Sequence, residues 1–216
     1  MPRLTRKEKQ AHTRTCLMEA AARVFTKRGL QQASIDEVAE DAGYTKGAFY
    51  ANFKSKEELF LAMLDERFAE RLEEIDRVMS TSADVTDQAH EAGADFMRYV
   101  SADPEWQRLF FEFAAYAARN EEFRQELVTR YRTLRDRIAQ GLARRAEEAG
   151  VEPPFPADQV ALMTFAMANG VALERLLEPD VVPDHLYGTM LASLFTGLKA
   201  LQDAATAAAA ADGDSA

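Results

Sequence analysis

Residues 34–59 read SIDEVAEDAGYTKGAFYANFKSKEEL, and this stretch predicts two short helices joined by a glycine turn and then the start of a third. Ser34 and Glu37 have the S-x-x-E spacing of a capping box, in which each side chain accepts a backbone N–H of the other residue at a helix start. Gly43 predicts the end of this helix, because glycine adopts the left-handed C-cap conformation at little steric cost. Thr45 then caps the second helix. This order is typical of helix-turn-helix units, whose second helix lies in the DNA major groove.

The apolar residues of the stretch have helical spacing, which predicts one buried side for each short helix. In the first helix they recur at i, i+3, i+4 and i+7 as Ile35, Val38, Ala39 and Ala42. In the second helix the residues expected to be buried are Ala48, Phe49 and Phe53. A preceding helix over residues 11–28, ended by Gly29, is expected to complete the core of a three-helix head.

At these residues the sequence resembles the TetR family of repressors. The family's DNA-reading segment has the form A-G-hydrophobic-[ST]-x-G-x-hydrophobic-Y-x-x-F-x-x-K-x-x-L, and residues 42–59 match it without a gap as AGYTKGAFYANFKSKEEL. Ala51 departs from the pattern, since the family more often has an aromatic residue or a histidine there. Residues 168–180 are also similar to the C-terminal body of many members. The resemblance covers most of the chain and implies a DNA-binding head on a helical body.

The exposed side of the second helix offers groups that suit base edges. Lys46, near the helix N-terminus, can reach guanine O6 and N7 or a phosphate. Gly47 lets the backbone approach the duplex closely, and Tyr50 can offer its hydroxyl to a phosphate or its ring to a thymine methyl group. By resemblance, these three residues match the family's base-facing positions. The alternative interpretation is an ordinary solvated helix surface.

A second set of residues suits phosphate oxygens, which position a protein on DNA without specifying sequence. Asn52, Lys56 and the hydroxyl of Ser34 carry suitable donors. By resemblance, the backbone-facing positions are Thr45, Asn52 and Lys56.

The charge distribution favours the same end of the chain. The formal net charge is −10, but residues 1–56 hold eleven Lys and Arg against six Asp and Glu, whereas residues 57–216 hold fifteen against thirty. A basic head on an acidic body directs the head toward phosphates. Residues 1–10, which we expect to be disordered without DNA, are either a solvated tail or an arm that adds phosphate contacts. Their basic residues are Arg3, Arg6, Lys7 and Lys9.

The remaining pattern predicts an all-α fold of about nine helices. A long helix from Ser55 to about residue 79, unbroken by glycine or proline, joins the head to the body. Further helices are expected over 84–101, from Pro104 to about Ala117, and over 121–149, 157–177 and 184–202. The expected domains are a helix-turn-helix DNA-binding domain over 1–56, a helical ligand-binding and dimerisation domain over 57–203, and a disordered tail over 204–216.

The last two helices are apolar on more than one side. In residues 157–177 one side carries Val160, Met163, Met167 and Val171, and another carries Leu162, Phe165, Leu173 and Leu176. A helix that is apolar on two sides must bury both, and the simplest cover for the second is another copy of the chain. The sequence therefore predicts a homodimer through about 157–202. Its two heads would engage half-sites ~34–36 Å apart, which predicts a palindromic operator on double-stranded DNA.

The body holds most of the aromatic residues, some of which can line a ligand cavity between helices. The competing interpretation of each one is packed core. The residues chosen as ligand contacts are Phe96, Phe110, Phe113, Tyr131, Met163, Met167 and Asn169. They suit a small, largely apolar effector, which would release DNA if it preferred a head spacing that does not fit the operator.

Other classes of protein are less well supported. Cys16 is the only cysteine, which excludes an internal disulfide or a cysteine-based zinc site. We expect no membrane span, because no apolar run approaches ~18 residues, and no secretion signal, so the expected location is the cytoplasm. The three histidines share no metal-binding spacing, and no catalytic or nucleotide-binding motif occurs. We therefore expect no cofactor and no metal.

These observations predict a ligand-responsive, homodimeric transcriptional regulator, and a repressor rather than an activator. The alternatives from other classes are a helical protein-interaction module and a helical-bundle enzyme, neither with a DNA-binding role.

Overall fold

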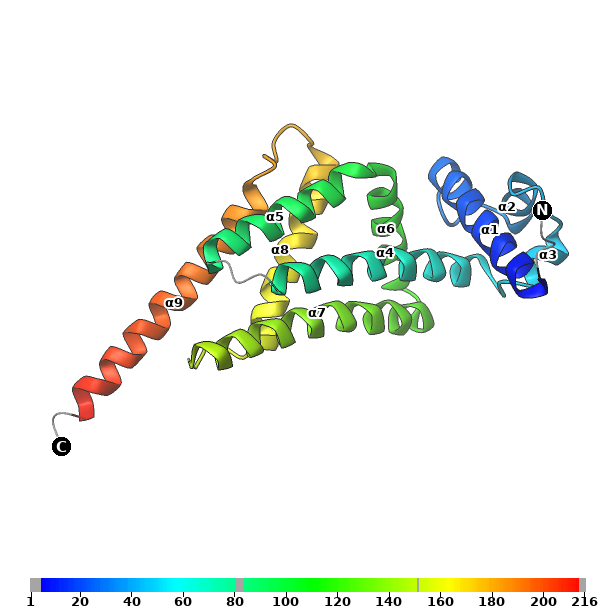
Figure 1. Ribbon diagram of the computed structural model, residues 1–216. Coiled ribbons are helices and arrows are strands. Elements are labelled where there is room, and N and C mark those ends of the chain that lie inside the picture. Colours follow the sequence, from blue (N-terminus) through cyan, green and yellow to red (C-terminus); the bar gives the residue numbers. More distant parts are fainter. Residues whose placement is uncertain (1–4, 81–83, 151, 214–216) are drawn as a thin grey trace. The chain divides into compact units, whose positions relative to one another are not determined.

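The computed structural model describes residues 5–80, 84–150 and 152–213, and the regular secondary structure of these residues is entirely α-helical (Figure 1). The helices of the described chain are α1 (Arg6–Arg28), α2 (Ile35–Asp41), α3 (Lys46–Tyr50), α4 (Lys56–Met79), α5 (Val85–Ala102), α6 (Pro104–Ala117), α7 (Glu121–Ala149), α8 (Ala157–Leu177) and α9 (Leu186–Gly213). The prediction of an all-α fold with about nine helices is confirmed.

The first helix starts earlier than predicted. Glu8 N donates to Thr5 Oγ1 over 3.3 Å and Thr5 N donates to Glu8 Oε2 over 2.7 Å, so a capping box begins α1 at Arg6. The expectation of a disordered basic arm is therefore wrong for three of its residues, which lie in α1: Arg6, Lys7 and Lys9. Arg3 lies outside the described residues.

The last helix ends later than predicted. α9 continues to Gly213 instead of ending near residue 202. The added residues are mostly alanine, which has the highest helix propensity of the amino acids. Residues 214–216 of the expected tail lie outside the described part of the chain.

The chain packs into two compact units. Unit 1 consists of the residues up to Ala69 together with Pro104–Arg130, and unit 2 of Glu70–Asp103 together with the residues from Tyr131 onward. α4 and α7 are continuous helices that contribute residues to both units. The long unbroken helix predicted to end near residue 79 is present as α4.

The core of unit 1 is aromatic. The ring of Phe60 lies 4.2 Å from that of Phe113 and 5.5 Å from that of Trp106, measured between centroids. Close to the chain start, the fully buried side chains are Leu17, Phe25, Leu30, Val38, Phe49 and Phe53. Burial of an aromatic or aliphatic side chain of this size stabilises a fold by roughly 1.5–3 kcal/mol, so α1, α2 and α3 form one packed head.

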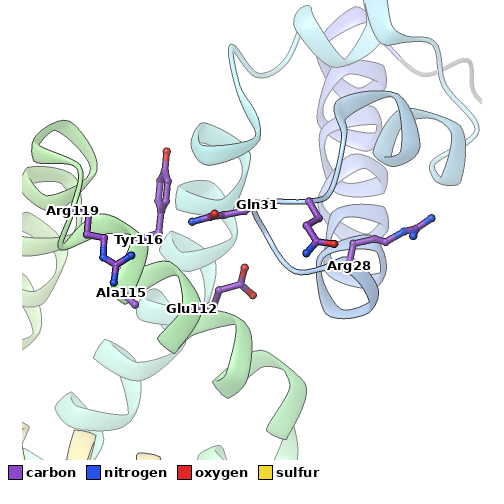
Figure 2. A pocket seen from close by; sticks show the side chains of 7 residues that line it. Arg28, Gln31, Glu112, Ala115, Tyr116 and Arg119 are labelled. Carbon is purple, nitrogen blue, oxygen red and sulfur yellow. The ribbon is translucent and has the colours of Figure 1, made fainter.

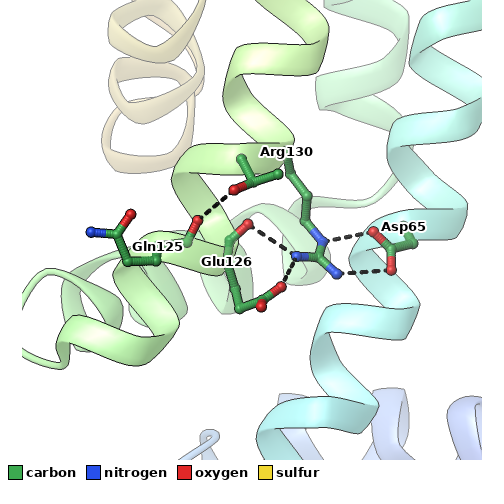
Figure 3. A network of polar contacts seen from close by, with 5 residues as sticks. Asp65, Gln125, Glu126 and Arg130 are labelled. Atoms are coloured by element: carbon green, nitrogen blue, oxygen red, sulfur yellow. Dashed lines mark hydrogen bonds and ion pairs between the residues drawn. The ribbon is translucent and has the colours of Figure 1, made fainter.

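A partly buried ion pair joins α4 to α7 inside unit 1 (Figure 3). Arg130 donates through Nε and Nη2 to the two carboxylate oxygens of Asp65, over 2.6 and 3.0 Å. Its Nη1 also donates to a carboxylate oxygen of Glu126 over 2.7 Å. Bidentate arginine–carboxylate pairs are stronger and more directional than single contacts, so this network fixes the two helices against each other.

Unit 2 is built on the pairing of α5 with α9, which lie side by side in Figure 1. Its buried cluster consists of Ala89, Met97, Ala168, Val171, Val182, Tyr187, Leu191 and Ala192. Tyr187 donates its hydroxyl hydrogen to Thr164 O over 3.0 Å, and burial raises the pKa of this phenol. The buried carboxylate of Asp95 is paired with the guanidinium groups of Arg77 and Arg98, which compensates the burial of its charge.

Two glycines permit the close approach of α5 and α9. A Cβ built on Gly93 would lie 2.3 Å from both Gly188 Cα and Gly188 N. We therefore expect Gly93→Ala to lower the free energy of unfolding by about 3 kcal/mol, because an added methyl group in a packed interior forces backbone shifts. Denaturant unfolding at matched protein concentration measures the change.

Gly197→Ala is the matched control, because this helical glycine of α9 has open space where its Cβ would lie. There the substitution should leave stability unchanged or raise it by up to ~1 kcal/mol, as alanine favours helix. Equal effects at Gly93 and Gly197 would contradict the close crossing.

α8 buries one side and exposes the other. The buried side carries Val160, Ala161, Thr164, Ala168, Val171 and Ala172. The large apolar side chains left exposed are Leu162, Met163, Leu173 and Leu177, with exposed fractions from 36% to 70%. By length and composition alone, α8 is a candidate membrane span, although the sequence analysis expected none. A third of its most apolar 18-residue window is buried. The cover of this exposed side by a second copy of the chain remains a prediction.

Candidate nucleic-acid interface

Local hydrogen bonds define the two short helices. Ser34 caps α2: Glu37 N donates to Ser34 Oγ over 3.2 Å and Ser34 N donates to Glu37 Oε2 over 2.9 Å. Those hydrogen bonds lower the pKa of the Glu37 carboxyl. Gly43 has a φ of 71°, which reverses the chain before Thr45 caps α3 by accepting from Ala48 N over 3.2 Å. The predicted helix-turn-helix geometry is therefore present.

α3 places one aromatic residue inward and the next outward. The side chain of Phe49 is fully buried, 5.9 Å from the ring of Phe53 between centroids. Its neighbour Tyr50 is 52% exposed. Lys46 and Gly47 are also exposed, and the nearest atom to a Cβ built on Gly47 is Thr45 Oγ1 at 3.7 Å. The three residues predicted to face bases thus share the exposed side of one helix, which Phe49 anchors to the core.

Lys46 has a partner that the sequence analysis missed. Its Nζ donates to Oδ2 of Asp36, in the first turn of α2, over 2.9 Å. Both side chains are well exposed, at 55% and 64%. Hydrogen bonding to the Asp36 carboxylate raises the pKa of Lys46. A charged donor and a charged acceptor therefore stand side by side on the exposed surface of α2 and α3.

The residues predicted to face phosphates also hold the head together. Asn52 Nδ2 donates to Ala48 O over 2.8 Å, and Asn52 O accepts Arg14 Nη1 over 3.2 Å. Lys56 Nζ donates to two carbonyl oxygens of the loop before α2, Gln31 O at 2.7 Å and Ala33 O at 3.2 Å. The phosphate contacts of Asn52 and Lys56 remain predictions.

Lys56→Met is expected to lower the free energy of unfolding of the DNA-free protein by about 1–2 kcal/mol, because two carbonyl groups lose a charged donor. Lys54→Met is the matched control, since Lys54 is exposed and carries the same charge two residues away. At low salt Lys56→Met should lose more DNA affinity than Lys54→Met, because Lys56 is a predicted phosphate contact, and thermal unfolding should show a loss of stability in Lys56→Met alone. Unchanged unfolding in both would show that the Lys56 contacts contribute nothing to stability.

α6 contacts the same loop elsewhere in unit 1. Leu30 N donates to Glu112 Oε1 over 2.8 Å, and this carboxylate oxygen lies 3.0 Å from a Cβ built on Gly29. Beside this contact is an open cavity of about 310 Å³ (Figure 2). It is lined by Arg28, Gln31, Gln32, Glu112, Ala115, Tyr116 and Arg119. The residues predicted to bind an effector do not line this cavity.

The predicted effector contacts fall into both units. Phe110 and Phe113 belong to unit 1 and are buried in its aromatic core, at 8% and 0% exposure. The others belong to unit 2: Phe96, Tyr131, Met163, Met167 and Asn169.

The unit 2 candidates pack against neighbouring groups, except Met163, which is exposed on the outer side of α8. The rings of Phe96 and Tyr187 are 4.8 Å apart between centroids, and those of Tyr131 and Phe165 are 4.7 Å apart. Burial raises the pKa of the Tyr131 phenol, which therefore stays neutral. Asn169 Nδ2 donates to Phe165 O over 3.0 Å. These contacts fix the side chains in place, and their role toward an effector remains a prediction.

Comparison with known proteins identifies relatives along most of the chain. Residues 17–63 match the family model of bacterial regulatory proteins, tetR family, and residues 94–198 match the model of the BetI-type transcriptional repressor, C-terminal. The HTH-type transcriptional regulator TtgR of Pseudomonas putida is 28% identical over 211 residues, which span 94% of this chain and 97% of TtgR. The uncharacterized HTH-type transcriptional regulator YfiR of Bacillus subtilis is 26% identical over 181 residues, which span 81% of this chain and 85% of YfiR.

Solved structures share the fold. The transcriptional regulator FadR of Bacillus subtilis, in complex with stearoyl-CoA, superposes with a TM-score of 0.72 at 15% identity, covering 83% of this chain and 96% of FadR.

Proposed function

The chain belongs to the TetR family of transcriptional regulators, ligand-responsive DNA-binding proteins that form dimers, and on this premise we propose that it is a homodimeric repressor released from a palindromic operator by a small, largely apolar effector. The observation that carries the proposal is the exposed side of α3, held outward by the buried Phe49. We assign DNA binding to residues 1–56, with contacts from Ser34, Thr45, Lys46, Gly47, Tyr50, Asn52 and Lys56. We therefore propose that the protein acts in the cytoplasm.

Self-association through about residues 157–202 would cover the exposed apolar side of α8. Leu162, Leu173 and Leu177 lie on one stripe of that helix, because 3.6 residues per turn bring positions four and eleven apart to the same side. Burying such side chains stabilises an interface by ~25 cal/mol per Å² of apolar surface. A two-fold dimer presents two identical heads, and a palindromic operator matches that symmetry.

The repressor role and the effector are inferred from the comparisons. The C-terminal match is to a repressor type, and FadR, which shares the fold, was solved with stearoyl-CoA, a ligand with a long apolar chain. We place the effector in the body, residues 57–203, against some of Phe96, Phe110, Phe113, Tyr131, Met163, Met167 and Asn169. Release of DNA requires that the effector bind more tightly to the form of the dimer that does not fit the operator.

The test is an unbiased operator selection on random duplexes, followed by a screen for compounds that dissociate the selected complex. We expect an inverted repeat bound by two protomers, with affinity that falls by roughly 0.9 log unit per log unit of salt for each phosphate neutralised. Failure to select any duplex at low salt would overturn the proposal, and a dimer without DNA affinity would favour a protein-interaction module. Dissociation only by polar compounds would overturn the apolar effector.

A further inference from the structure

We propose that Asp36 and Lys46 together recognise the major-groove edge of a single G·C base pair. This inference rests on the proposed placement of α3 in the major groove. The ion pair places Asp36 on the same exposed surface as the predicted base-reading residues, although it belongs to α2. Lys46 is the first residue of α3, and the N-terminal residues of a recognition helix are those that contact base edges.

Asp36 contributes little to the fold of the head: in the first turn of α2 its carboxylate is worth about 0.3–1 kcal/mol at the helix N-terminus. Ser34 and Glu37 form the capping box of α2 without it. Its exposed ion pair is of the kind that contributes only ~0–1 kcal/mol to folding. A carboxylate on a DNA-facing surface also repels phosphates, which makes it unfavourable there unless it accepts a hydrogen bond from the DNA. Among the base edges of the major groove, cytosine N4–H and adenine N6–H are the donors.

The geometry of the pair complements a base pair. Lys46 Nζ and Asp36 Oδ2 stand 2.9 Å apart. In a G·C pair, guanine O6 and cytosine N4 are hydrogen-bonded to each other at about the same separation, and each has one remaining site that points into the groove. Lys46 can therefore donate to O6 while Asp36 accepts from N4–H.

The number of ammonium hydrogens favours G·C over A·T. An ammonium group has three N–H donors, and in Lys46 one is taken by Asp36. The remaining two match guanine O6 and N7, which are adjacent acceptors. At an A·T pair, Asp36 can still accept from adenine N6–H, but Lys46 finds thymine O4 beside a methyl group, so one N–H stays unpaired. The pair should thus discriminate G·C from A·T at one position of each half-site.

The experiment starts from the operator selected by the unchanged protein and measures Kd for duplexes in which each base pair is replaced symmetrically in both half-sites. Asp36→Ala, Lys46→Met and the double variant form a double-mutant cycle. We expect one position where replacing G·C by A·T weakens the unchanged protein by about tenfold or more, the range expected for a specific base contact. Each single variant should reduce this preference to below about threefold, and the double variant should reduce it no further.

Asp41→Ala is the matched control, because Asp41 is an exposed carboxylate at the other end of α2, paired with Arg23 at 2.6 Å. It removes the same charge and should leave the preference unchanged. A uniform change in affinity for all duplexes with Asp36→Ala, or independent effects at the two positions, would overturn the inference. If the unchanged protein selects no duplex, the proposed function itself fails, which is a separate outcome.

Discussion

Replacing Leu173 with glutamate is expected to convert the dimer to monomers and to lower operator affinity by about a thousandfold. Leu173 is 39% exposed on the outer side of α8, opposite the buried side that carries Val160 and Val171. A carboxylate there is solvated in the monomer but would be buried without a partner in the dimer, which costs several kcal/mol. Once the heads separate, the second half-site no longer benefits from tethering, which is worth 10²–10⁴ in avidity.

Sedimentation velocity and fluorescence anisotropy measure the two effects of Leu173→Glu. The matched control is Val85→Glu, because Val85 is an apolar residue of unit 2 with 48% exposure that lies outside the proposed interface. That variant should remain dimeric and bind the operator normally. A dimeric Leu173→Glu protein would show that α8 is not the dimer interface.

Alanine substitutions of the two adjacent aromatic residues of α3 are expected to have different effects, one on stability and the other on operator affinity. Phe49→Ala removes a fully buried ring and should lower the free energy of unfolding by about 3–5 kcal/mol. Tyr50→Ala removes a ring that is 52% exposed, so stability should hardly change. Its operator affinity should fall by roughly tenfold to a hundredfold, with altered sequence preference, because a base-facing contact is worth ~1–3 kcal/mol.

Thermal unfolding without DNA, followed by operator titration at one salt concentration, separates the two variants. Tyr50→Phe is the control for the ring, since it keeps the apolar surface and removes only the hydroxyl. Equal loss of affinity with Tyr50→Phe and Tyr50→Ala would assign the contact to the hydroxyl and a phosphate. If Tyr50→Ala binds every duplex as the unchanged protein does, α3 does not read DNA through this side.

Local chemistry explains which features could be predicted from the sequence. The capping residues Ser34 and Thr45 and the reversal at Gly43 act within a few residues of chain, so their spacing defines them. Thr5 and Glu8 have the same capping-box spacing as Ser34 and Glu37, and this spacing indicates the observed start of α1. The length of α9 differs from the prediction because an alanine-rich stretch near a chain end is typical both of a tail and of helix-forming sequence.

Contacts between separate segments could not be predicted in this way. The pairing of Asp36 with Lys46, and the bonds from Lys56 to the loop before α2, depend on how helices pack. Apolar spacing likewise cannot separate a cavity wall from a filled core, since both need apolar side chains at helical intervals. Phe113, chosen as an effector contact, is fully buried against Phe60 in unit 1.

The central claim is that two copies of the exposed side of α3 lie in the major groove of one duplex. Dimethyl sulfate protection of the selected operator tests it most directly, because the reagent methylates guanine N7 in that groove. We predict two clusters of protected guanines, related by two-fold symmetry and centred about 10–10.5 base pairs or a multiple of that distance apart. Protection in a single cluster, or none on a duplex that the protein binds, would contradict the claim.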